Sequence, residues 1–203
     1  SWNWKANGGA ASVGSNTNGS INTTDTSVNT AAGFSISTYT GTGSSATIGH
    51  GLSKAPEMIW VKKINATGDW MLFFNTPAND NLNNTSDATD YYRLNGNQVA
   101  TDSNNAWDDT VPTTAVWSAG SDGAINGDGN TYVAYCWHSV DGYSKIGAYR
   151  GTGNAAGAPF IHTGFRPSWV VVKQSSNAGD WYVYDIGRDG YNSDNDNFTY
   201  NRN

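Results

Sequence analysis

The feature that most constrains the fold of this chain is an internal repeat. Residues 33–74 and 142–185 share a Gly-aromatic-Ser start, a Tyr-x-Gly-Thr-Gly run, a proline followed by Val-Lys, and a Gly-Asp-Trp tripeptide. The offset between matched positions drifts only from 109 to 111, so few insertions separate the two copies. Since one unit of this length can hardly cover its own apolar face, we expect both copies to pack into one body.

A fainter similarity links residues 12–22 to residues 118–126 and leaves two interpretations open. If it is real, the chain holds two units of about 85 residues, joined by a segment near residues 93–117. If it is accidental, the second copy lacks its end and the polypeptide continues past Asn203, which we favour because residues 198–203 look like a strand cut short. We therefore predict an N-terminal extended segment packing on the sandwich (1–32), a first β repeat (33–141) and a second, incomplete repeat (142–203).

Alternation of apolar and polar residues between turn residues predicts many short strands. They are expected at residues 34–39, 46–50, 58–63, 70–74, 91–94, 115–118, 131–138, 143–149, 160–162, 169–173 and 181–184. Asn, Gly, Thr and Ser supply 90 of the 203 residues, and no stretch combines helical spacing with caps, so a helical bundle is excluded. The sequence predicts an all-β protein, a β-sandwich of the jelly-roll or lectin-like kind built from two related repeats.

Charge and apolar content narrow the class of partner. The net charge is −6 with only 11 Lys and Arg, which argues against nucleic acid as a partner. No apolar run approaches the roughly 18 residues of a membrane span, so we expect no membrane insertion. Cys136 is the single cysteine and lies in the alternating run T-Y-V-A-Y-C-W-H, which favours a buried strand thiol over a nucleophile.

Candidates for acid–base catalysis are few. Glu57 is the only glutamate, and its counterpart in the second repeat is Ser168, so it lacks the glutamate partner of a glycosidase pair. Asp69 and Asp180 occupy matched positions, each just before a tryptophan, and could form a catalytic pair. We favour the alternative that Gly-Asp is the turn of a hairpin. We therefore predict no catalytic residues and no enzyme activity.

Metal ligands are also weakly indicated. His50 and His162 fall in matched places beside glycine turns, where a histidine more often satisfies a buried carbonyl than binds a metal, and His138 ends an aromatic strand. No zinc-type histidine spacing occurs. Oxygen-rich segments at residues 80–90, 102–109, 121–130 and 193–197 could hold a structural calcium ion, but solvated turns are the preferred interpretation. We predict no metal site and no cofactor.

Nine tryptophans raise the question of carbohydrate binding, because sugar rings stack on exposed indole groups. Four that lie in strand-like runs are expected in the core: Trp60, Trp70, Trp137 and Trp181. Trp2, Trp4 and Trp107 lie among polar residues and are better candidates for exposure. We select Trp107, between Asn-Asn and Asp-Asp pairs, as the candidate glycan contact, although an anchor for its loop is the stronger interpretation.

Seven motifs taken together resemble those of a family of uncharacterised domains in virion proteins of marine tailed phages. They are W-K-A-N-G-G-A-A (4–11), G-F-S-I-S-T-Y-T-G-T-G (33–43), G-H-G-L-S-K-A-P-E-M-I-W-V-K (49–62), T-Y-V-A-Y-C-W (131–137), G-Y-S-K (142–145), T-G-F-R-P (163–167) and R-D-G-Y-N (188–192). The first motif departs from the family pattern by one inserted residue, Asn7.

This resemblance implies a phage structural component, part of a tail fibre or of a head-surface appendage, and it transfers no catalytic residues. It also implies chains that continue beyond R-D-G-Y-N. The leading hypothesis is thus a non-enzymatic fibre or capsid-decoration domain on the virion surface. Its expected partners are other virion proteins, further copies of itself and host surface glycans. The alternatives are a lectin-like carbohydrate-binding module of a secreted protein and a glycan-degrading enzyme using Asp69 or Asp180.

Overall fold

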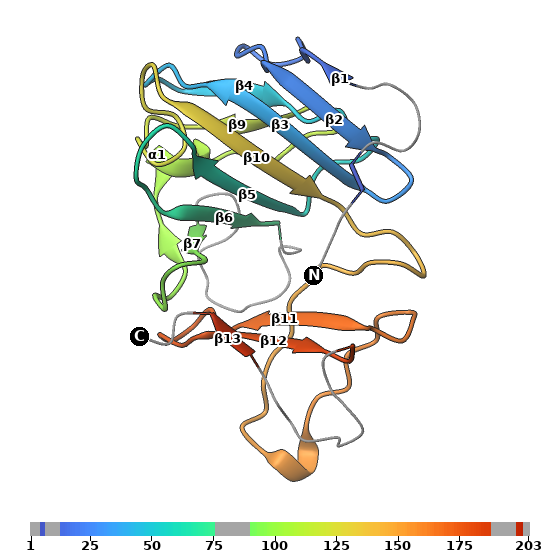
Figure 1. Cartoon of the computed structure of the whole chain (residues 1–203). Helices are drawn as coiled ribbons and strands as arrows, with labels where there is room; N and C mark the ends of the chain where they lie inside the picture. Colours follow the sequence, from blue (N-terminus) through green and yellow to red (C-terminus); the bar gives the residue numbers. More distant parts are fainter. Residues whose placement is uncertain (1–4, 7–12, 76–89, 188–197, 201–203) are drawn as a thin grey trace.

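Antiparallel strands make up nearly all of the regular structure (Figure 1). The computed structural model describes residues 5–6, 13–75, 90–187 and 198–200, and structural statements refer to these ranges. Within them, the helical elements are two short ones, α1 (Asn104–Trp107) and the 3-10 turn η1 (Ala155–Gly157). The all-β, sandwich-like fold predicted from the alternating pattern is confirmed.

The largest element is an eight-stranded sheet. Its order from edge to edge is β1 (Val13–Gly14), β2 (Asp25–Asn29), β3 (Phe34–Thr40), β10 (Thr131–Trp137), β5 (Met58–Lys63), β6 (Trp70–Phe74), β7 (Asp90–Arg93) and β8 (Thr101–Asp102). Ala134 of β10 lies opposite Ser37 on one side and Val61 on the other. A strand from the middle of the chain therefore joins two strands from its beginning.

The main hydrophobic core lies between this sheet and a two-stranded layer behind it in Figure 1, made of β4 (Ala46–Gly49) and β9 (Val116–Ala119). Alternate residues of the central strands point into the core and are fully buried: Ile59, Val61, Met71, Phe73, Tyr132 and Ala134. The second layer contributes Ile48 and Trp117, and the Trp117 ring lies edge-on to Tyr39 at 5.7 Å. Each such large side chain contributes about 1.5–3 kcal/mol by leaving water.

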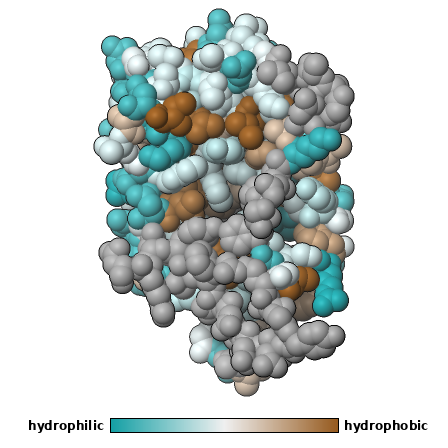
Figure 2. Space-filling model, viewed as in Figure 1, coloured by the Kyte–Doolittle hydropathy of each residue, from teal (hydrophilic) through white to brown (hydrophobic). Residues whose placement is uncertain are grey.

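The opposite face of the sheet carries a smaller aromatic cluster. The ring of Trp137 stacks on Phe34 at 5.0 Å and meets Trp60 edge-on at 5.0 Å. Ala6 packs into the same cluster, so this residue lies against the same face of the sheet. Figure 2, in the view of Figure 1, shows hydrophobic residues reaching the surface in its upper half. Trp137 is buried as predicted, whereas Trp60 is only half-buried.

A separate small sheet lies below the main sheet in Figure 1 and consists of β11 (Trp169–Lys173), β12 (Trp181–Asp185) and β13 (Phe198–Tyr200). Trp181 joins it to the rest of the protein. Its ring lies 6.2 Å from those of Phe74 and Tyr92, and its Nε1 donates to the Arg93 carbonyl at 3.0 Å. Trp181 is thus the core residue that the sequence predicted.

The hairpins β5–β6 and β11–β12 have the same register. Lys62 lies opposite Trp70, and Lys173 lies opposite Trp181. The repeat over its whole predicted length stays a prediction, because the rest of the second copy has a different structure.

The strands predicted at residues 143–149 and 160–162 are wrong. Apart from an isolated bridge between Val140 and Ser144, the described structure of residues 142–165 contains no strand pairing. The matching strands of the first copy, β3 and β4, are held by β10 and β9, and no described strand takes these places in the second copy. An alternating sequence pattern favours a strand only where a neighbouring strand is available to pair with it.

Part of the predicted N-terminal segment forms strands of the main sheet. β2 pairs with β3 from Asp25 opposite Thr38 to Asn29 opposite Phe34. The Asn29 side-chain amide also donates to the Lys5 carbonyl at 2.9 Å. The division into residues 1–32, 33–141 and 142–203 stays a prediction.

Candidate functional site

The single glutamate fastens the segment that follows β10. The Glu57 carboxylate accepts a hydrogen bond from the Ser139 backbone N–H at 2.8 Å and another from the Ser139 hydroxyl. The same hydroxyl oxygen accepts the N–H of Ile146 at 2.9 Å. Glu57 therefore serves as an internal acceptor that ties residues 139–146 to the start of β5.

Asp69 takes part in a polar cluster at the end of the β5–β6 hairpin. Its carboxylate pairs with the Arg93 guanidinium at 2.9 Å and accepts the Asn95 amide at 2.8 Å, while the Asn95 oxygen accepts the Trp70 N–H at 2.9 Å. Asp180, at the matched place in β11–β12, lies near Lys173. Burial lowers the pKa of Lys173, and the negative charge of Asp180 offsets part of that change. Both positions lie at hairpin ends, as the preferred interpretation expected.

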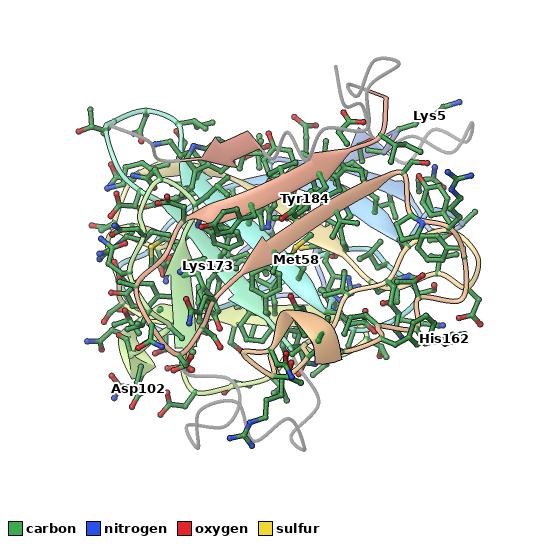
Figure 3. The ribbon with its side chains drawn as sticks, turned by 90° about the horizontal axis from the view of Figure 1, so that it is seen from below. Lys5, Met58, Asp102, His162, Lys173 and Tyr184 are labelled. Carbon is green, nitrogen blue, oxygen red and sulfur yellow. The ribbon has the colours of Figure 1, made fainter. Side chains whose placement is uncertain are left out.

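His50 is fully buried and satisfies backbone groups. Its Nδ1 accepts the Leu52 N–H at 3.1 Å, which leaves Nε2 to donate to the Thr113 carbonyl at 3.1 Å. Burial lowers the pKa of His50, so the ring is held neutral. The predicted bond of this histidine to a carbonyl is present, although Thr113 itself is an exposed residue, while the repeat counterpart His162 is exposed (Figure 3).

Cys136 lies in the core with its side chain 1% exposed, as the alternating run predicted. Burial raises the pKa of its thiol far above the usual range, so the reactive thiolate does not form at neutral pH. Burial also raises the pKa of Tyr39, whose hydroxyl donates to the Ile125 carbonyl at 2.6 Å. These two groups stabilise the core and have no access to a substrate.

Two of the oxygen-rich segments are described in full by the structure. In residues 121–130, Asn126 is fully buried, and its amide donates to the carbonyls of Ser44 at 2.7 Å and Gly120 at 2.8 Å. Residues 102–109 include α1. In the described part of the chain, no group of three or more His, Cys, Asp or Glu side chains could hold a metal ion. The segment at residues 193–197 and most of 80–90 lie outside the described residues.

The prediction that Trp107 is exposed is wrong. Trp107 is 1% exposed and lies in the main core, edge-on to Phe73 at 5.5 Å and to Trp117 at 5.9 Å. Asp108 and Asp109, which follow it, both adopt left-handed backbone conformations, and the turn directs the indole inward. A sugar has no indole surface to stack on at this position, so Trp107 acts as the anchor of its loop. Trp2 and Trp4 lie outside the described residues.

Large apolar side chains are exposed mainly in the second half of the chain. Eight of the eleven that are exposed in the described ranges lie between residues 143 and 186. Three of them, Val170, Tyr182 and Tyr184, lie on one face of the small sheet together with the half-buried Val172. We call this set the outer face. Figure 3 views the molecule from below, with the small sheet in front of the main sheet and Tyr184 on β12.

The outer face was not predicted, because alternation of apolar and polar residues alone does not tell which side of a strand is covered. The sequence carries no direct signal for this face, because its exposure depends on which strands lie beside β11. Among the described strands, none takes the place beside β11 that β10 takes beside β5. An apolar surface of this kind commonly marks a site of interaction with another polypeptide.

The fold and these clusters define a class: an all-β, sandwich-like domain in which Glu57, Asp69 and His50 bond to groups of the protein itself, Cys136 lies in the core, and the small sheet exposes an apolar face. The whole chain, residues 1–203, matches a domain of unknown function (DUF7483), and the protein belongs to that family. Searches among curated proteins and solved structures find no match. No helix of the described residues is long and apolar enough to cross a membrane.

Proposed function

We propose that this protein is a non-enzymatic structural domain of a bacteriophage particle, a tail-fibre or capsid-decoration domain on the virion surface. It contacts other virion proteins, assembles with copies of itself and mediates adhesion to the host surface. The observation that carries the virion assignment is the set of seven motifs spread along the chain from residue 4 to residue 192.

The chemistry of the described residues supports a structural role over a catalytic one. Glu57, Asp69 and His50 each bond to groups within the protein, and none of them faces a cluster of further acid or base groups. A surface rich in Asn, Thr, Ser and Gly offers many hydrogen bonds while losing little side-chain entropy on contact. Such contacts are individually weak, and a particle that repeats them gains affinity through multivalency.

Immunogold electron microscopy tests the proposal. Antibodies raised against the 203-residue protein are applied to particles banded on a density gradient from an infected culture whose phage genome encodes the chain, with pre-immune serum as control. We expect gold at fixed positions on fibres or capsid, together with the chain in the mass spectrum of the same band. If the chain is found only as free protein above the band, the virion assignment is wrong.

A second candidate function, carbohydrate binding, is favoured by the exposure of Tyr182 and Tyr184 on the outer face. Tyrosine rings can stack on sugars in the way first assigned to Trp107. A glycan array probed with the wild type and with Tyr184→Ala tests it. Binding to a defined glycan that is lost in the variant would support the lectin-like alternative, and an array without signal would remove it.

A further inference from the structure

The outer face of the small sheet corresponds to a face that is buried elsewhere in the same protein. With an offset of 111 residues, Val170, Val172, Tyr182 and Tyr184 stand where Ile59, Val61, Met71 and Phe73 stand in the β5–β6 hairpin. The residues of the first hairpin are fully buried in the main core, whereas Tyr184 is 43% exposed. The two hairpins thus have the same register, but the same four positions are buried in the first hairpin and exposed or half-buried in the second.

The two hairpins also differ in whether the first strand, β5 or β11, has a second neighbouring strand. β5 has β10 on the side away from β6, whereas β11 is the edge strand of its sheet, and no described strand pairs with the side of β11 that faces away from β12. The Ile186 N–H donates to the Ser168 carbonyl at 3.0 Å, so Ser168, Val170 and Val172 direct their backbone groups toward β12. Val171, one residue out of phase, therefore directs its N–H and C=O to the open edge.

Residues 142–162 are irregular for the same reason, because no described strand stands beside them as β10 stands beside β3. Tyr149 is 44% exposed, although its counterpart Tyr39 on β3 is 1% exposed. When His162 is matched to His50, Phe160 stands at the place of Ile48 on β4; Phe160 is 89% exposed, and Ile48 is fully buried. In the first copy, β3 is held in place by its seven-residue pairing with β10. Residues 142–149 have the same kind of sequence but no such partner among the described strands.

We propose that the second half of the chain is an acceptor for one added β-strand. An antiparallel strand of the β10 type, uncharged and alternating between aromatic and small apolar residues, pairs with the open edge of β11. It takes the register that β10 takes on β5, so that its equivalent of Tyr135 lies opposite Val171 and its equivalent of Cys136 lies opposite Val170. Residues 143–149 then pair with its other edge, as β3 does with β10.

The chemistry of the two edges supports this choice of occupant. β10 carries no charge, and the one charge of β11 lies at its end on Lys173, so residues 169–172 of the open edge lack the charged side chains that usually protect an edge strand. Ala134 and Cys136 flank Val61 and Ile59 in the first copy, and small residues at these places leave room for the apolar residues of the outer face. Main-chain hydrogen bonds supply affinity in this mode, and alternate side chains supply specificity. The inference rests on the geometry and is independent of the virion assignment.

A synthetic peptide of residues 129–139 is the probe, labelled with a fluorophore and carrying Cys136→Ala to prevent disulfide exchange. Fluorescence anisotropy measures its binding to the 203-residue protein and to the variants Val171→Pro and Val171→Ala. Proline removes the N–H at the open edge and leaves the bonds to β12 in place, whereas alanine removes the side chain and keeps the N–H. We expect saturable binding to the wild type, a dissociation constant within about threefold for Val171→Ala, and at least about tenfold weaker binding for Val171→Pro.

N-methylated peptides test the register if the proline variant fails to fold. N-methylation at Tyr135 blocks the edge that faces β11, and N-methylation at Ala134 blocks the other edge. Binding to the wild type should be lost with the first peptide and retained with the second. Hydrogen exchange of the amides of residues 143–149 should slow when the unmodified peptide saturates the protein.

Three results would overturn the proposal. The first is a failure of the peptide to bind, or equal binding of a scrambled peptide of the same composition. The second is equal binding of the two N-methylated peptides. The third is concentration-dependent dimerisation in sedimentation equilibrium that Val171→Pro abolishes and Val171→Ala does not, because the occupant of the edge would then be a second copy of this chain.

Discussion

Replacing Trp107 with alanine should destabilise the protein by about 3 kcal/mol. The indole is 1% exposed and packs against Phe73 and Trp117. An aromatic side chain of this kind buries roughly 200 Å², which at about 25 cal/mol per Å² contributes about 5 kcal/mol. Its Nε1 is buried without a hydrogen-bond partner among the described residues, and removing that group returns about 1–3 kcal/mol of desolvation cost.

Thermal unfolding followed by far-UV circular dichroism measures the effect. For a protein of this size, 3 kcal/mol corresponds to a fall in Tm of about 6–12 °C. Trp107→Phe is the matched variant, because it keeps a ring in the core and removes the unpartnered N–H, and it should cost about 1 kcal/mol. Tyr184→Ala, at an exposed aromatic position, should stay within about 0.5 kcal/mol of the wild type. A Tm for Trp107→Ala within about 2 °C of the wild type would refute the placement of this side chain in the core.

Three further predictions concern buried or paired groups. The pKa of His50 is lowered in the folded protein, so the unfolded state binds more protons, and the free energy of unfolding should fall as the pH drops below about 6.5. Denaturant titrations at pH 7.0 and 5.5 should show this fall, and the fall should be smaller in His50→Gln. An equal fall in the wild type and the variant would contradict the prediction. Cys136 should resist a thiol reagent in the folded protein and react at once in denaturant, which a colorimetric thiol assay detects. Asp69→Asn, which removes a half-exposed ion pair with Arg93, should cost less than about 1 kcal/mol in urea unfolding and leave the far-UV spectrum unchanged.

Much of the strand pattern could be predicted from the sequence. The ranges 58–63, 70–74 and 169–173 coincide with β5, β6 and β11, because each combines alternation with clear turn residues at both ends. β2 was missed, since its sequence D-T-S-V-N is polar and it becomes a strand by pairing with β3. Local preference does not contain that information.

The candidate sites, too, could be predicted only where local sequence decides the contact. The role of His50 could be predicted because a histidine beside a glycine turn more often satisfies a carbonyl than binds a metal, and the structure places its Nε2 on the Thr113 carbonyl. Whether Trp107 is buried or exposed could not be predicted, because the polar residues around it indicate a loop but not the direction of its side chain. The outer face could not be predicted either, because it depends on which strands are present beside β11.

The central place of β10 has a consequence for biosynthesis. β3 ends at residue 40 and β5 at residue 63, but both have one edge unpaired until residues 131–137 have left the ribosome. At roughly 5–20 residues per second, the first strands wait for several seconds with open apolar edges. Pairing over such separations along the chain is slow, and the nascent protein is exposed to aggregation during that interval. Co-translational chaperone binding to the first 75 residues is therefore expected to matter more for the yield of this protein than the stability of its finished fold.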